Sequence, residues 1–185
     1  MSKSRPSSWI ANAAILFAAC GAFSAFGQTF AASGTTTLSV NVAAEASLSI
    51  GTATTSLTSA TGLFADYTGT TNFTYKIRTT QAGGTGAVNV QITGDFSGTG
   101  GPSVAVPPSS GDALTYSCTV ASPATACTGP VTALTTATTS VASFGADARS
   151  AKAGNSGSLA WTLTNDPVYK TGSYTATATF TISAT

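Results

Sequence analysis

The side chains that most enzymes use for acid–base and nucleophilic chemistry are scarce in this sequence. It contains no histidine, which removes the commonest general base, the usual serine and cysteine triads and ordinary zinc sites. Beyond residue 27 there are six carboxylates, well separated in the sequence: Glu45, Asp66, Asp95, Asp112, Asp147 and Asp166. A fold could still bring two aspartates together as a glycosidase pair, but solvated turn residues are the simpler interpretation. We therefore predict no enzyme activity, no cofactor and no metal site.

The cysteines point to structure rather than to redox chemistry. Cys118 and Cys127 are separated by eight residues, which is not the Cys-x-x-Cys spacing of redox sites. In an oxidising compartment we expect a structural disulfide between them. Their spacing is too short to bridge two sheets over a long span.

Aromatic side chains are the candidates for ligand binding. Tyr75, Trp161 and Tyr174 fall on the apolar side of predicted strands and are expected to fill the core. Flat rings in loops can stack on sugar rings. The three candidate ligand contacts of this kind are Phe64, Tyr67 and Tyr169.

The N-terminal segment has the pattern of a secretory signal peptide. Lys3 and Arg5 precede an apolar stretch over residues 9–26, and small residues before Gln28 predict a signal peptide of residues 1–27, with cleavage at Ser24 or Ala32 as alternatives. An uncleaved anchor would need a longer and less Ala-rich span. The residues before Cys20 also resemble a lipobox, which leaves lipidation of Cys20 open. The predicted location is the cell surface or the medium, with membrane contact only during export.

The composition predicts one folded domain over residues 28–185. Hydrophobic residues make up 42% of the chain and charged residues only 7%, whereas disorder is typical of low hydrophobicity with high net charge. Without Lys3 and Arg5 the chain carries five basic and six acidic residues. So neutral a surface is a poor match for nucleic acid.

Alternation of apolar and polar residues predicts β-strands throughout this domain. It is seen in residues 38–50, 73–78, 88–93, 114–120, 159–163 and 174–182. Residues 82–86 have the composition of a hairpin turn, and residues 94–111 that of a long loop. The last two alternating runs could pair with each other across residues 165–172. Residues 141–153 offer the one short turn or helix. We predict an all-β fold, an immunoglobulin-like β-sandwich of about seven or eight strands.

The first alternating run is too long for one strand. Residues 35–50 form an alternating arm, and its thirteen residues from Leu38 to Ile50 would extend about 43 Å, well beyond an ordinary strand. One interpretation is a first strand that kinks near Ala43 and crosses from one sheet to the other. The alternative is that Leu38, Val40 and Val42 leave their own domain as a donor-strand arm and complete a neighbour's sheet.

The two ends of the domain resemble a known family. An exported β-domain that begins with TTTLSVNV (residues 35–42) and closes with GSYTATATFTI (residues 172–182) is similar to spore coat U and archaic chaperone–usher pilins. This family commonly has a cysteine at the end of the first strand, where this chain has residues 46–48, Ala-Ser-Leu. The resemblance implies a periplasmic chaperone, an outer-membrane usher and self-assembly into surface fibres by strand addition.

These observations favour an exported structural or interaction subunit of the bacterial cell surface, pilin-like or coat-like. The alternative is a secreted β-sandwich module that binds glycan or protein through its loop aromatics.

Overall fold

The structure is a computed structural model that describes residues 33–185, so the predictions for the signal peptide and for Cys20 lie outside the described residues. Residues 33–44 form no strand. The ten strands that follow are β1 Glu45–Ile50, β2 Thr58–Ser59, β3 Tyr67–Arg78, β4 Gly86–Gly94, β5 Leu114–Val120, β6 Thr125–Ala126, β7 Val131–Thr132, β8 Thr139–Phe144, β9 Asn155–Leu163 and β10 Thr177–Ala184. The part of the chain that the structure describes contains no helix.

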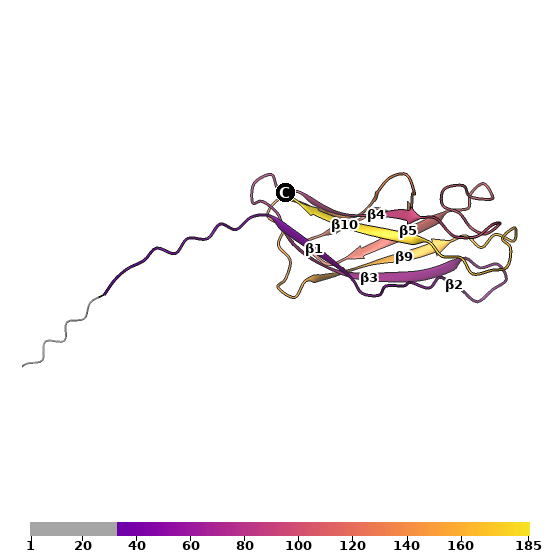
Figure 1. Ribbon diagram of the computed structural model, residues 1–185, viewed down its shortest axis with the longest axis horizontal. Coiled ribbons are helices and arrows are strands. Elements are labelled where there is room, and N and C mark those ends of the chain that lie inside the picture. Colours follow the sequence, from indigo (N-terminus) through magenta and orange to yellow (C-terminus); the bar gives the residue numbers. More distant parts are fainter. Residues whose placement is uncertain (1–32) are drawn as a thin grey trace, which may run out of the picture. The chain divides into compact units, whose positions relative to one another are not determined.

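The strands form two antiparallel sheets, as the alternation predicts (Figure 1). One has the order β1-β3-β9-β5-β7, with β2 also paired to β3, and the other has the order β10-β4-β8-β6. The prediction of an all-β sandwich is confirmed. Seven of the ten strands have six or more residues, and the other three have two.

Apolar side chains from both sheets share one core. In β3 the side chains of Phe73, Tyr75 and Ile77 are buried, whereas Thr74 and Lys76 between them are exposed. Strands β4, β5, β8 and β9 contribute the rest of the core in the same alternating manner. Burial of one face of each strand is what period-two alternation predicts.

Two local predictions are wrong. Residues 82–86 do not close a hairpin, because β3 and β4 lie in different sheets. The last two long strands, β9 and β10, are likewise in different sheets and do not pair. Residues 141–153 contain the end of β8 and two turns but no helix, so the turn alternative is confirmed there. Alternation identifies a strand but not its partner, because every strand of a sandwich has the same pattern.

The predicted disulfide between Cys118 and Cys127 is present, with a Cα–Cα distance of 5.5 Å. Cys118 lies on β5 of one sheet, and Cys127 directly follows β6 and donates its backbone N–H to Val141 on β8 of the other sheet. The short spacing therefore does link the two sheets, which the sequence did not indicate. Closing a loop of this length stabilises a fold by about 2 to 3 kcal/mol.

The first strand does not cross between sheets. β1 spans only residues 45–50 and pairs with β3 alone. The preceding apolar side chains are exposed, at 91% for Leu38, 86% for Val40 and 59% for Val42. The long alternating run is therefore half strand and half uncovered segment.

Candidate functional site

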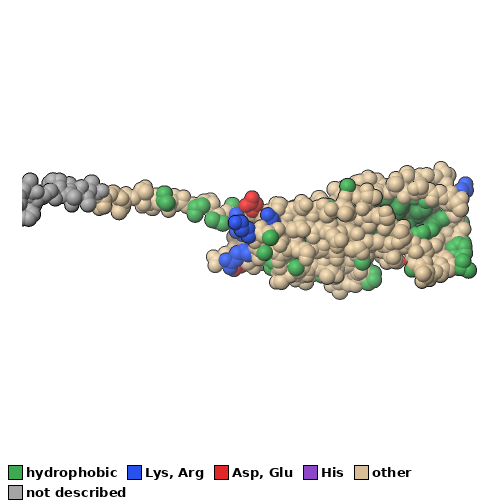
Figure 2. All heavy atoms as spheres, turned by 90° about the horizontal axis from the view of Figure 1, so that it is seen from below, with side chains coloured by type: hydrophobic (Ala, Val, Ile, Leu, Met, Phe, Trp, Pro, Cys, Tyr) green, Lys and Arg blue, Asp and Glu red, His purple; other side chains and the backbone are tan. Residues whose placement is uncertain are grey.

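The main cavity is a groove between the free edges of the two sheets. β1 pairs only with β3 and β10 pairs only with β4, so each strand leaves one edge without a partner strand among residues 33–185. β1 and β10 contact each other, and the groove lies beyond that contact, between residues 50–57 and residues 173–180. It has a volume of about 1160 Å³. Figure 2 shows a hollow with hydrophobic side chains at one end of the face in view.

One wall of the groove is the irregular segment between β1 and β2. Thr55 Oγ1 lies 2.6 Å from Thr71 Oγ1, which also accepts a 2.9 Å hydrogen bond from Trp161 Nε1. This polar chain ties the segment to a buried part of β3. The segment also lies close over Gly69, where a Cβ atom would come within 2.6 Å of the Ser56 carbonyl oxygen. Only glycine lets the wall approach β3 so closely.

The opposite wall is β10 with the four residues before it. Tyr174 OH donates to the Lys170 carbonyl oxygen at 2.8 Å. Its ring lies against Gly101, where a Cβ atom would be 2.0 Å from Tyr174 Cε1. Tyr174 is half-buried and lines the groove, so the prediction that it fills the core is wrong. The same prediction is confirmed for Tyr75 and Trp161.

The floor of the groove is formed by the hydrophobic core. Ile92, Leu114, Trp161 and Leu163 line it and are buried. The apolar surface that the groove leaves open to water belongs to half-buried side chains around this floor, among them Leu57, Phe96 and Phe180. An apolar occupant would remove that surface from water.

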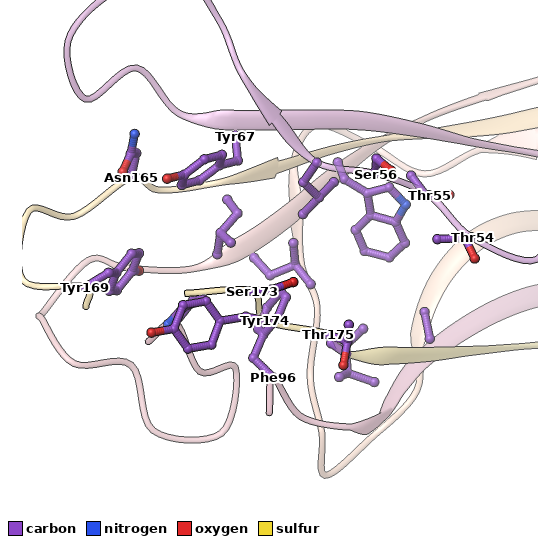
Figure 3. Close-up of a pocket in the computed structure, with 18 of the residues that line it drawn as sticks. Thr54, Thr55, Ser56, Tyr67, Phe96, Asn165, Tyr169, Ser173, Tyr174 and Thr175 are labelled. Carbon is purple, nitrogen blue, oxygen red and sulfur yellow. The ribbon is translucent and has the colours of Figure 1, made fainter. Parts of the chain in front are cut away.

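The three candidate ligand contacts come together at one end of the groove. Phe64 and Tyr67, which are three residues apart, and the distant Tyr169 all line it. Tyr67 is the first residue of β3, so the prediction that it lies in a loop is wrong. Figure 3 shows Tyr67 and Tyr169 around the same opening as Tyr174. Phe64 is 62% exposed and adopts a φ of 57°, which is unfavourable for a bulky side chain.

The Tyr169 hydroxyl is committed to a carboxylate. It donates to Asp112 Oδ2 at 2.9 Å. Burial raises the pKa of Tyr169, and the hydrogen bond to Asp112 and that residue's negative charge raise it further. The phenol therefore stays protonated and acts as a fixed donor near the groove.

The structure brings Asp112 and Asp166 together, as the glycosidase alternative would require. Hydrogen bonds from Ser109 and from the Val168 N–H lower the pKa of Asp166, and the Asp112 side chain lowers it further, so the two carboxyl groups are neighbours. Asp166 lines the groove, whereas Asp112 is buried and its Oδ2 accepts the hydrogen bond of the Tyr169 hydroxyl. This geometry fits a loop anchor.

A second carboxylate organises the long loop beside the groove. Asp95 accepts hydrogen bonds from the N–H groups of Phe96 and Val104 and from Ser103 Oγ, at 2.6 to 2.8 Å, and a longer one from the Ala105 N–H. Burial alone would raise the pKa of Asp95, but these hydrogen bonds outweigh it and hold the pKa below its ordinary value. Residues 95–105 are thus held by this carboxylate and by backbone hydrogen bonds from Ser97 to Thr175 and from Lys170 to Gly100, without forming a strand.

Sequence reasoning missed most of the groove. Residues 52–57 are Thr, Ala, Ser and Leu without a clear pattern, and Phe96 lies in a loop that looks featureless. The one available signal was the alternation of β10 itself. It marks Ala178 and Phe180 as inward-facing, and both line the groove.

No group of three or more His, Cys, Asp or Glu residues within residues 33–185 is placed to hold a metal ion. Over the same residues there is no helix long and apolar enough to cross a membrane. No known protein family, curated protein or solved structure matches the chain.

Proposed function

We propose that this protein is an exported structural subunit of a bacterial cell surface that assembles with further copies of itself by strand addition. The observation that carries the proposal is a matched pair of features in one chain. One is a groove between two free sheet edges, and the other is an uncovered segment whose apolar side chains alternate.

The chemistry of the two features is complementary. An edge strand offers unpaired backbone N–H and C=O groups, which an added strand can satisfy, while the alternate side chains of that strand fill pockets between the sheets. β10 supplies such an edge, and the half-buried Leu57, Phe96 and Phe180 supply apolar surface in the groove. Leu38, Val40 and Val42 have the spacing that places all three on one face.

The dimensions also agree. Residues 35–42 would extend about 26 Å as a strand. β10, whose free edge such a strand would pair with, also has eight residues in extended conformation. The groove is larger than the roughly 300 to 1,000 Å³ of an ordinary small-molecule pocket, which suits a peptide segment better than a single small ligand.

A peptide experiment tests this proposal. The protein lacking residues 33–42 should be monomeric by gel filtration and should form no fibres by electron microscopy, whereas the intact protein assembles. A synthetic peptide of residues 35–44 should bind the truncated protein and raise its melting temperature. The control peptide carries Ser at positions 38, 40 and 42 and should not bind. Intact protein that stays monomeric at high concentration, with no effect of the peptide, would contradict the proposal.

A groove variant gives the matched control on the acceptor side. Ala178→Glu places a charge on the groove side of β10 and should block the peptide, because an unpaired carboxylate would be buried on docking. Thr181 is exposed on the other face of the same strand. Thr181→Glu should therefore bind the peptide as the parent protein does.

A second candidate function is glycan binding at the same opening. It is favoured by the convergence of Phe64, Tyr67 and Tyr169 on the groove, since aromatic rings stack on sugars. Binding on a glycan array that is lost in Tyr67→Ala and Tyr169→Ala would support this function. An array without any bound glycan would count against it.

A further inference from the structure

The charged side chains of the domain are sorted to its two ends. Residues 33–185 contain eleven charged side chains, and they fall into two groups, here called the basic end and the acidic end. The basic end comprises Lys76, Arg78, Arg149, Lys152, Glu45 and Asp147. The acidic end comprises Asp66, Asp95, Asp112, Asp166 and Lys170.

Contacts and strand register place the basic group at one end of the sandwich. Glu45 and the four cations line one shallow pocket of about 360 Å³, and Asp147 forms a 2.8 Å ion pair with Arg149. Glu45 pairs with Arg78 where β1 begins and β3 ends. Figure 2 shows Lys and Arg side chains gathered at one end of the face in view, with a further one at the opposite end near the apolar hollow. Four cations and two carboxylates give this end a side-chain charge of +2.

The acidic group flanks the opposite ends of the same strands. Tyr67, Leu163 and Leu114 form one cross-strand row, and Asp66, Asp166 and Asp112 lie within three residues of that row. Asp95 directly follows Gly94, which pairs with the first residue of β10. Asp166 and Lys170 line the groove itself. Four carboxylates and one cation give this end a side-chain charge of −3.

The uncovered segment joins the domain at the basic end. Arg78 Nε donates to the Ala43 carbonyl oxygen at 2.7 Å, and Arg78 also contacts Glu45 at 3.2 Å. Val42 is three residues from Glu45, or about 10 Å of extended chain. This length is close to the Debye length of about 10 Å at 0.1 M salt. An acceptor copy that binds Val42 therefore also interacts electrostatically with the basic end of the donor copy.

We infer that successive copies stack head to tail, with the basic end of one copy against the acidic end of the next, and that this contact sets the direction and the salt dependence of assembly. The inference rests on the proposed function, since it takes a second copy as the occupant of the groove. A donor strand that runs antiparallel to β10 places its C-terminal end at the acidic end of the acceptor copy. The basic end of the donor copy, with a side-chain charge of +2, then meets the acidic end of the acceptor copy, with a charge of −3. A donor strand in the reverse direction would bring two basic ends together, which like-charge repulsion disfavours.

Charge variants test the inference by the rate of assembly, followed by light scattering. Lys76 and Lys152 are exposed and form no ion pair within residues 33–185, so the double variant Lys76→Glu and Lys152→Glu should fold normally, as circular dichroism will check. Its basic end becomes −2, and assembly at low salt should slow about tenfold or more, because electrostatic steering turns into repulsion. For the parent protein, raising the salt from about 0.01 M to about 1 M should slow assembly by a similar factor.

Two further variants provide the control and the rescue. Ser117 lies in the middle of β5, and Ser140 of β8 pairs with Asn89 in the middle of β4; both serines are exposed. The double variant Ser117→Glu and Ser140→Glu adds negative charge away from either end and should not slow assembly comparably. The triple variant Asp66→Lys, Thr68→Lys and Val168→Lys changes exposed residues and turns the acidic end to +1. Combined with the two Glu substitutions at positions 76 and 152, it should restore the rate.

The outcomes separate the two proposals. Intact protein that assembles at a rate independent of salt and of all charge variants would overturn the head-to-tail inference and leave strand addition standing. Intact protein that does not assemble at all would overturn both. Slowing by the end variants, with rescue by the combined variant, would establish the contact.

Discussion

The segment before β1 and the strand β3 have the same alternating pattern, but their apolar side chains differ in burial. In β3 the apolar side chains of Phe73, Tyr75 and Ile77 are buried, because β1 and β9 pair with its two edges and the second sheet covers its face. The apolar side chains of Leu38, Val40 and Val42 are exposed. Alternation thus records the need for a sheet partner, and it does not say whether the partner is in the same chain.

The largest expected effect on stability concerns β3, whose apolar side chains are buried. Phe73→Ala should lower the free energy of unfolding by about 3 to 5 kcal/mol, because it leaves a cavity between the sheets. Urea denaturation measures the change. Thr74→Ala, one residue along on the exposed face, should change it by less than about 0.5 kcal/mol. Equal effects at the two positions would break the distinction between the faces of β3.

An intermediate effect concerns the loop beside the groove, which is held in part by a carboxylate and forms no strand. Asp95→Asn should cost about 1 to 2 kcal/mol at pH 7, because the loop loses hydrogen bonds to a carboxylate. The pKa of Asp95 is lowered in the folded protein, so its contribution is present above the unfolded pKa of about 3.9 and is lost as the pH falls through the folded value.

The measurement is urea unfolding of both proteins at pH 7 and again at pH 2 to 3. The difference between parent and Asp95→Asn should shrink at the lower pH. A difference that stays constant with pH would mean that the carboxylate charge does not hold the loop.

The smallest expected effect on stability concerns the segment before β1, whose apolar side chains are exposed. Serine at positions 38, 40 and 42 should change the unfolding free energy of the isolated subunit by less than about 0.5 kcal/mol, because no apolar surface is buried there. The same substitutions should abolish assembly. A loss of stability comparable to that of Phe73→Ala would show that the segment already packs within its own domain.

Local pattern predicted the elements better than their arrangement. The alternation at residues 73–78, 88–93, 114–120 and 159–163 predicted β3, β4, β5 and β9, and the short spacing of Cys118 and Cys127 predicted their disulfide. The glycine-rich residues 82–86 and the last two alternating runs suggested hairpins that do not exist. Turn composition is the same whether a chain reverses within one sheet or passes to the other.

The candidate site shows the same division. Phe64 and Tyr169 were recognisable as loop aromatics, whereas Tyr67 was assigned to a loop and instead begins β3; only the fold places all three on one groove. Tyr174 has the parity of a core residue and instead lies against Gly101 at the groove wall. The polar residues 52–57 gave no signal, because their role depends on their position between β1 and β2 rather than on their chemistry.

The sequence by itself determined that the described chain is a set of strands with one apolar face each, because side chains alternate across a strand whatever its neighbours are. It also showed that this alternation begins before β1, at Leu38. Only the tertiary structure decided which strands pair, that β1 and β10 keep free edges with a groove between them, and that the charges separate to two ends. These properties depend on contacts between residues far apart in the chain, and such contacts leave no periodic trace in any one segment.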